Sequence, residues 1–189
     1  MFRRETSCLI LIDLQEGFND PKWGERNNPL LERNAAELLG AFREAHVPVI
    51  HVRHDSAEAA SPLRSGARGF DFLKWAQPRA GEEIFTKSAH GAFVGTKLEA
   101  HLRWRGITEP VLGGLTSDHC VNTTARMACD LGFAPLLASD ATATFPRRAP
   151  GGHWLPANGV QEAALASLDG EFARVVTTAQ ILYHLRSTQ

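Results

Sequence analysis

The chain has 189 residues, of which 43% are hydrophobic and 22% are charged, so its composition is that of a globular protein and not of a disordered or fibrous one. Twenty Lys and Arg residues stand against 21 Asp and Glu residues, which gives a formal net charge of −1. The largest basic runs are the pairs at 3–4 and 147–148, and this argues against a protein that binds nucleic acid through a basic surface. The length favours a single domain over residues 1–189.

The first strand is predicted at 8–12, because the run CLILI is continuous and aliphatic, as in parallel strands that are covered on both faces. A helix is predicted to follow over 31–45, where apolar residues recur at 3.6-residue spacing between charged ones. Further strands are predicted at 47–52, 84–87, 111–115, 134–139 and 174–178. Further helices are predicted near 95–105, 119–131, 159–169 and at the C-terminal end.

Two long loops, at 55–82 and 141–158, interrupt this alternation of strands and helices, and loops of such length are usually functional. The element order predicts an α/β fold, a three-layer α/β/α sandwich with a mostly parallel, six-stranded, doubly wound sheet.

The cysteine count and the N-terminal run predict where the protein works. Cys8, Cys120 and Cys129 are an odd number in a chain long enough to fold without disulfides, which favours reduced thiols. The apolar run at 8–12 is too short for a signal peptide or a membrane span. We therefore expect a cytoplasmic protein that does not associate with membranes.

Three reactive side chains lie at predicted strand ends, and ligands of open α/β sheets bind outside the carboxyl ends of the strands. Asp13 follows the first strand, Lys87 ends the third, and Cys120 follows the fourth where a helix is expected to begin. A helix N-terminus and an ammonium both favour a thiolate, so Cys120 is predicted to be a nucleophile with a lowered pKa. Asp13 is the expected base, and Lys87 its electrostatic support.

Each of these residues alone is also consistent with a structural role. A cysteine at a helix start often packs as a small apolar residue, Asp13 is also suited to cap the following turn, and Lys87 is also suited to be a solvated lysine. Their shared position at one edge of the sheet favours the catalytic interpretation. Cys8 and Cys129 lack such neighbours and are expected in the core.

Histidine is the commoner partner of a nucleophilic thiol. His119 is adjacent to Cys120, and adjacent helical residues point about 100° apart, so His119 is poorly placed to take the thiol proton. His90 and His119 are both candidates to line the substrate pocket. His90 is the better of the two, although a loop or packing role is at least as well supported for it.

A metal site formed by His51, His54 and Asp55 is disfavoured, because positions 51 and 54 face opposite sides of a strand. We therefore expect neither a metal nor another cofactor.

Six segments together carry a resemblance to a known family. They are LILIDLQEGF at 9–18, WGERNNP at 23–29, HVRHDS at 51–56, KSAHGAF at 87–93, GLTSDHCVNTTARMACDLGF at 114–133 and SDATATF at 139–145. With them, the sequence resembles the isochorismatase-like cysteine hydrolases, which include nicotinamidases and related amidases, over roughly residues 6–180.

The resemblance implies that Asp13, Lys87 and Cys120 form a catalytic triad. It also implies a cis peptide bond between Leu115 and Thr116, with the backbone amides of Thr116 and Cys120 forming an oxyanion hole. A homodimer or a larger homo-oligomer is implied as well.

Two differences from related proteins limit which reaction and which metal content are expected. Metal-binding nicotinamidases carry a D-x-H pattern after the second strand, whereas this chain has Arg53-His54-Asp55, so that metal site is expected to be absent. Isochorismatases lack the cysteine, so the presence of Cys120 favours attack on a carbonyl. Phe18, Trp23 and the 55–82 loop are expected to cover the pocket, although the two aromatic residues are equally consistent with ordinary packing.

These observations predict a hydrolase that cleaves the C–N bond of a small amide through a thioester on Cys120. Two alternatives stay open: hydrolysis of an ester or a vinyl ether on the same scaffold, and a small-molecule-binding oligomer without catalytic activity.

Overall fold

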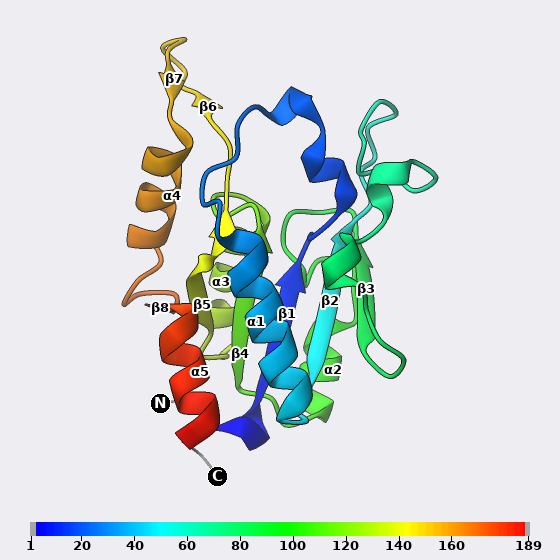
Figure 1. Ribbon diagram of the computed structural model, residues 1–189, viewed down its shortest axis with the longest axis vertical. Coiled ribbons are helices and arrows are strands. Elements are labelled where there is room, and N and C mark those ends of the chain that lie inside the picture. The colour runs from blue at the N-terminus through cyan, green and yellow to red at the C-terminus, as the bar shows by residue number, and fades with distance from the viewer. Residues whose placement is uncertain (1–2, 188–189) are drawn as a thin grey trace.

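The computed structural model describes residues 3–187, which form a three-layer α/β/α sandwich (Figure 1). The central sheet has the order β3-β2-β1-β4-β5-β8, and every neighbouring pair of its strands is parallel. Its strands are β1 (Ser7–Ile12), β2 (Val49–His54), β3 (Glu83–Lys87), β4 (Glu109–Leu115), β5 (Leu136–Ala143) and β8 (Arg174–Val176). The helices are α1 (Leu31–Glu44), α2 (Leu98–Trp104), α3 (Cys120–Asp130), α4 (Ala157–Ala166) and α5 (Thr178–Ser187).

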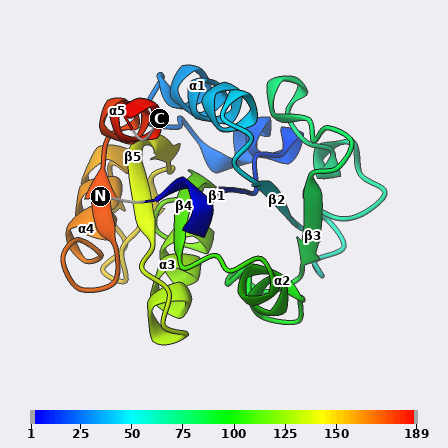
Figure 2. The same cartoon turned by 90° about the horizontal axis from the view of Figure 1, so that it is seen from below.

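Both faces of the sheet are covered, which explains the continuous aliphatic run of β1. Helices α1 and α5 lie on one face, and α2 and α3 lie on the other (Figure 2). Side chains alternate along a strand, so Leu9 and Leu11 pack in the core under α1, while Ile10 and Ile12 pack in the core under α3. All six residues of β1 are buried.

The strand order places a topological switch point between β1 and β4. The chain runs outward from β1 through β2 to β3, and then returns to the other side of β1 to form β4. A Cβ atom on Gly114 would lie 2.0 Å from the carbonyl oxygen of Ile12, so only glycine permits this approach of β4 to β1. The carboxyl ends of these two strands therefore meet where α/β proteins bind their ligands.

The long connections hold more structure than the sequence indicated. The 55–82 segment contains short 3₁₀ helices at Arg68–Phe70 and Lys74–Ala76. Strand β5 continues past the predicted end at 139 to Ala143, because an irregularity in its register with β4 lets pairing resume beyond the polar residues. The predicted 141–158 loop then forms a hairpin of β6 (Arg147–Arg148) and β7 (Trp154–Leu155), which extends beyond the sheet (Figure 1).

Two of the three cysteines were expected in the core, and this is correct for one of them. Cys8 is fully buried in β1. The expectation for Cys129 is wrong, because this residue is only partly buried and lies one position beyond the buried stripe of α3 that ends at Ala128. Over residues 3–187, no helix has both the length and the apolar character needed to cross a membrane.

Candidate active site

Asp13 lies directly after β1 and is held there by the backbone. Its φ of 52° is in the left-handed region, which few residues other than glycine adopt. Its amide donates a 2.8 Å hydrogen bond to the carbonyl oxygen of Val52, so the turn is tied to β2. The side chain is fully buried below the switch point.

Lys87 reaches Asp13 from the far edge of β2. It is the last residue of β3, and its Nζ donates a 2.7 Å hydrogen bond to Asp13 Oδ2, with both side chains fully buried. His54 pairs with Lys87 in the register of β2 and β3, and its Nδ1 lies 3.3 Å from the same Nζ. Such a buried pair fixes both charges, because removing one partner leaves the other unpaired at a cost of about 3–5 kcal/mol.

Cys120 completes the arrangement from the other side of the switch point. It is the first residue of α3, and its exposed fraction is 7%. Asp13 Oδ1 is buried and has no well-formed hydrogen bond. A carboxylate oxygen of Asp13, a ring nitrogen of His54 and the Sγ atom of Cys120 all lie within 4.8 Å of one another. The free carboxylate oxygen is therefore available to accept the thiol proton.

The pKa of Cys120 is raised to about 12, first by burial and then by the adjacent charge of Asp13, although Lys87 acts in the opposite direction. The expectation that this pKa is lowered is therefore wrong. The reason is that the thiol lies inside the protein and faces a carboxylate, and both effects outweigh the ammonium. Burial likewise raises the pKa of Asp13, against the opposing effect of Lys87. Cys120 is therefore a neutral thiol beside a carboxylate whose proton affinity is increased.

His54 is a residue of this site that was considered from the sequence only as a disfavoured metal ligand. Burial and the nearby Lys87 lower its pKa, so the imidazole is neutral and Nδ1 can accept a hydrogen bond from the ammonium. It ends β2 as Lys87 ends β3, and the strand-end rule applied to every strand would have identified it.

The turn before α3 contains the implied cis peptide bond between Leu115 and Thr116. Within residues 3–187, the amides of Thr116 and Cys120 donate no hydrogen bond, whereas the amides of Ser117 and Val121 in the same turn both do. Two unused donors thus belong to the turn that carries the thiol.

A cavity of about 340 Å³ opens over these groups. The predicted pocket residues line this cavity, and so do residues of the loop that was expected to cover it. The complete lining is Asp13, Phe18, Lys22, Trp23, His54, Ser56, Glu58, Ser61, Leu63, His90, Thr116, His119, Cys120 and Arg147. The connections after β1 and β2 and the 147–155 hairpin gather at this end of the sheet (Figure 1).

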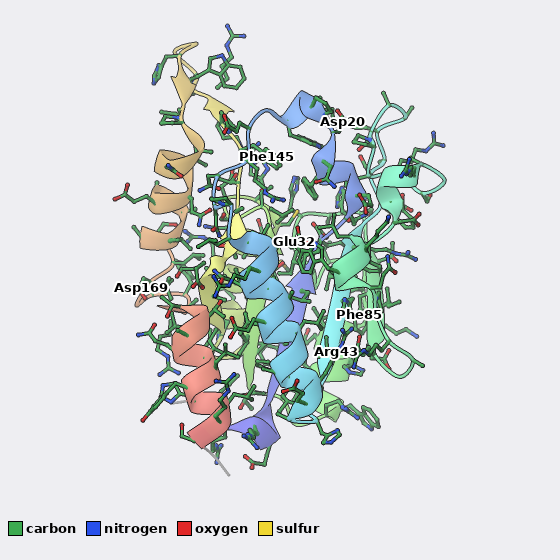
Figure 3. The ribbon with its side chains drawn as sticks, in the orientation of Figure 1. Asp20, Glu32, Arg43, Phe85, Phe145 and Asp169 are labelled. Atoms are coloured by element: carbon green, nitrogen blue, oxygen red, sulfur yellow. The ribbon has the colours of Figure 1, made fainter. Side chains whose placement is uncertain are left out.

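Aromatic rings form one wall of the cavity. The ring centroids of Phe18 and Trp23 lie 5.6 Å apart, and Phe18 stacks on Phe145 at 6.1 Å. Phe145, labelled in Figure 3, belongs to the segment that follows β5, so this stack joins that segment to the connection that follows β1. Phe18 is buried and therefore serves the core as well as the cavity.

Histidines line another part of the cavity. The ring of His90 lies 6.4 Å from that of His54 and 5.8 Å from that of His119. His119 Nε2 is 3.4 Å from a carboxylate oxygen of Asp118, and its side chain is half exposed. His119 therefore points to its neighbour in the turn and to solvent, which agrees with its expected poor placement as the base for Cys120.

A second ion pair holds the same turn. Asp118 accepts hydrogen bonds from Arg147 Nε at 2.7 Å and Nη2 at 3.1 Å, and from the Thr144 hydroxyl at 2.5 Å. Arg147 Nη2 also lies 3.3 Å from Thr116 Oγ1. Burial acts to raise the pKa of Asp118, but the bonds from Arg147 and Thr144 outweigh it and bring the pKa to about 2. Sequence reasoning missed this pair, because Arg147 lies in a segment interpreted as a loop.

The three residues weighed as a metal site are not brought together. His51 Nε2 lies 2.9 Å from Glu82 Oε2, while Asp55 Oδ1 accepts a 2.8 Å hydrogen bond from the amide of Ser65. His54 instead faces Lys87. These residues therefore do not fit the metal site of the metal-binding nicotinamidases.

Comparison with known proteins agrees with this fold. The model of the isochorismatase domain matches residues 7–180. The isochorismatase family protein YrdC of Bacillus subtilis is 40% identical over 178 residues, which cover 94% of this chain and 95% of YrdC. A crystal structure of an isochorismatase-family protein from Chromobacterium violaceum has a TM-score of 0.95 at 42% identity, and the match covers 98% of this chain and 96% of that one.

The fold is that of an α/β/α hydrolase, and the candidate site lies at its switch point. The chain belongs to the isochorismatase family. One more distant relative, nicotinamidase 3 of Arabidopsis thaliana, is 28% identical over 152 residues and matches 74% of each chain. The name of this relative states that it is an amidase, and it belongs to a family of hydrolases.

Proposed function

We propose that the protein is an amidase that cleaves the C–N bond of a small amide through a thioester on Cys120. The observation that carries this proposal is the arrangement of Asp13: one carboxylate oxygen is bound by the Lys87 ammonium at 2.7 Å, and the other is unpartnered on the side of the thiol. A carboxylate that served only as a structural ion pair would have both oxygens satisfied.

The first half of the reaction forms the thioester. Asp13 Oδ1 accepts the Cys120 proton as the sulfur attacks the amide carbon, so no free thiolate has to form in a site where its pKa is about 12. The amides of Thr116 and Cys120 are the proposed donors to the carbonyl oxygen as it becomes negative. Asp13 then gives its proton to the departing nitrogen, and ammonia or an amine leaves.

The second half regenerates the thiol. Asp13, again ionised, removes a proton from water as the water oxygen attacks the thioester carbonyl. The C–S bond breaks, the carboxylic acid product is released, and the proton returns to the sulfur. Lys87 keeps its position throughout, where it offsets the negative charge that Asp13 carries before and after each proton transfer.

The cavity supports a small substrate. A volume of about 340 Å³ is near the lower end of small-molecule sites in proteins. Phe18 and Trp23 provide an apolar wall, while His90 and His119 provide polar atoms. The relative named nicotinamidase supports an amide as the reacting group, since its substrate is a primary amide on a ring.

Ammonia release from a panel of small primary amides tests the proposal, with Cys120→Ala as the matched control. We expect turnover of at least one amide by the wild type and none above background by the variant. Rapid acid quenching followed by mass spectrometry should find the acyl group on the peptide that contains Cys120.

Turnover that persists in Cys120→Ala would contradict covalent catalysis. Hydrolysis of esters or vinyl ethers without hydrolysis of any amide would favour the first alternative. Saturable binding of the same amides without any hydrolysis would favour a non-catalytic binder.

A further inference from the structure

Asp13, His54 and Cys120 bring a carboxylate, an imidazole and a thiol together at one point. Their donor atoms lie within 4.8 Å of one another, and the residues are buried or half-buried, unlike the exposed acidic clusters common on protein surfaces. Sulfur, nitrogen and oxygen donors in this combination suit zinc and related thiophilic ions. We propose that these three residues bind a thiophilic divalent cation such as Zn²⁺ or Cd²⁺, and that the bound cation blocks the nucleophile.

The free oxygen of Asp13 is the second observation that supports a ligand here. Oδ1 is buried, belongs to a fully buried side chain and has no well-formed hydrogen bond. A cation that takes the place of the Cys120 proton can bind this oxygen while Lys87 stays on Oδ2. Cys120 and His54 both line the cavity, so the cation has a path from solvent and an open position for water.

Binding exchanges a proton for a metal. The S–H bond of Cys120 breaks, the proton passes to solvent, and a bond between sulfur and the cation forms, with no change in oxidation state. His54 contributes a ring nitrogen of the neutral imidazole, the form in which histidine binds metals. A sulfur bound to the cation is a weaker nucleophile than a free thiolate, and the cation occupies the space that the substrate carbonyl would need. Because no covalent change has occurred, removal of the cation by a chelator reverses the block.

Lys87 opposes the cation. Its ammonium lies 2.7 Å from Asp13 Oδ2 and 3.3 Å from His54 Nδ1, two of the three groups that the cation would share. Charge repulsion from this resident cation weakens metal binding in the wild type. Replacing Lys87 by methionine, which keeps a long side chain without the charge, should therefore strengthen it.

This site differs from the aspartate and histidine pattern of metal-binding nicotinamidases, because it uses the candidate nucleophile itself as a ligand. Metal binding does not depend on the proposed amidase activity; only its inhibitory consequence rests on that function. The two can therefore fail separately.

Titration of the intact protein with Cd²⁺ tests the binding, followed by the ultraviolet absorption of the thiolate bound to cadmium. We expect a band that saturates at one equivalent in the wild type and in Cys129→Ser, and no band in Cys120→Ser. Cys129 is the matched control because it is the other cysteine that is not fully buried.

His54→Ala should weaken the affinity for Cd²⁺ by at least about tenfold, the lower bound for losing even an outer partner of a metal site. Lys87→Met should increase the affinity for Cd²⁺ by a similar factor, provided that circular dichroism shows this variant to be folded. If Lys87→Met does not fold, the test rests on His54→Ala. A band that persists in Cys120→Ser, or an affinity unchanged in His54→Ala, would overturn the proposed site.

The inhibitory consequence is tested with an amide that the wild type hydrolyses. Zn²⁺ should abolish turnover, and a chelator should restore it. Full turnover at a Zn²⁺ concentration that saturates the site would overturn the block while leaving the binding site intact.

Discussion

Two carboxylates lie at the same edge of the sheet, each beside one cation, and they have opposite properties. Asp13 is paired with Lys87 through one oxygen, its other oxygen is free, and its pKa is raised. Asp118 is bound by Arg147 and by Thr144 through both oxygens, and its pKa is lowered to about 2. A carboxylate with an unsatisfied oxygen can take a proton, whereas a saturated one can only hold its neighbours in place.

The choice of cation fits this division. An ammonium is a point charge that satisfies one oxygen and leaves the other free, while a guanidinium binds both oxygens of a carboxylate in a fixed plane. In the proposed reaction Lys87 thus supports the base, whereas Arg147 joins the hairpin to the turn that carries Cys120. Each of the following predictions separates the two ion pairs.

The largest expected effect is on turnover. Asp13→Asn removes the base and should lower kcat for a hydrolysed amide by about 10²- to 10⁴-fold, the usual contribution of a general acid and base. Steady-state ammonia release measures this. The matched variant Asp118→Asn keeps an oxygen acceptor in the turn, so its kcat should stay within about tenfold of the wild type, below that range. Equal losses in the two variants would remove the distinction between the carboxylates.

The second prediction concerns stability. Asp118→Ala should lower the free energy of unfolding at pH 7 by about 1–3 kcal/mol, because Arg147 and the Thr144 hydroxyl lose their acceptor. The folded-state pKa of about 2 is below the ordinary 3.8, so this contribution is present above about pH 4 and is lost as the pH falls towards 2. Urea unfolding of both proteins at pH 7 and pH 3 measures it. A difference that is the same at both pH values would contradict an electrostatic origin.

The third prediction is the pH dependence of the reaction. Catalysis needs ionised Asp13, so kcat/KM should fall with decreasing pH through the pKa of this residue. Because burial raises that pKa above 3.8, the midpoint of the acid limb should lie above 3.8. Asp118→Asn should leave the midpoint in place, since its carboxyl stays ionised down to about pH 2. A midpoint that shifts in Asp118→Asn would show that Asp118, and not Asp13, is the base.

The smallest expected effect is that of Thr144→Val. The hydroxyl donates a single hydrogen bond to Asp118, so its loss should cost about 1 kcal/mol of stability and leave kcat unchanged. Thermal unfolding and ammonia release measure the two quantities. A large fall in kcat at unchanged stability would mean that the Asp118 pair acts on the reaction more directly than proposed.

Much of this arrangement could be predicted from the sequence, because it depends on local patterns. The aliphatic run of β1 identifies a strand covered on both faces, and the strand-end rule places Asp13, Lys87 and Cys120 at one edge. Phe18 was expected at the pocket from the connection that contains it, and the structure places it there.

What could not be predicted depends on contacts between distant segments. The register between β4 and β5 is irregular, and the segment that follows β5 places Arg147 against Asp118. No sequence pattern indicates that irregularity. The pKa of Cys120 was expected to fall because the helix start and Lys87 were visible in the sequence. Its burial and the facing charge of Asp13 were not visible, and they decide the sign of the shift.

The central claim is that Asp13 acts on Cys120 both as an adjacent charge and as its base. The most direct test measures iodoacetamide alkylation of Cys120 and amide turnover in the same Asp13→Asn protein at pH 8. Loss of the carboxylate charge lowers the pKa of Cys120, so the account predicts faster alkylation together with loss of turnover. Alkylation that is slower than, or equal to, that of the wild type would contradict it.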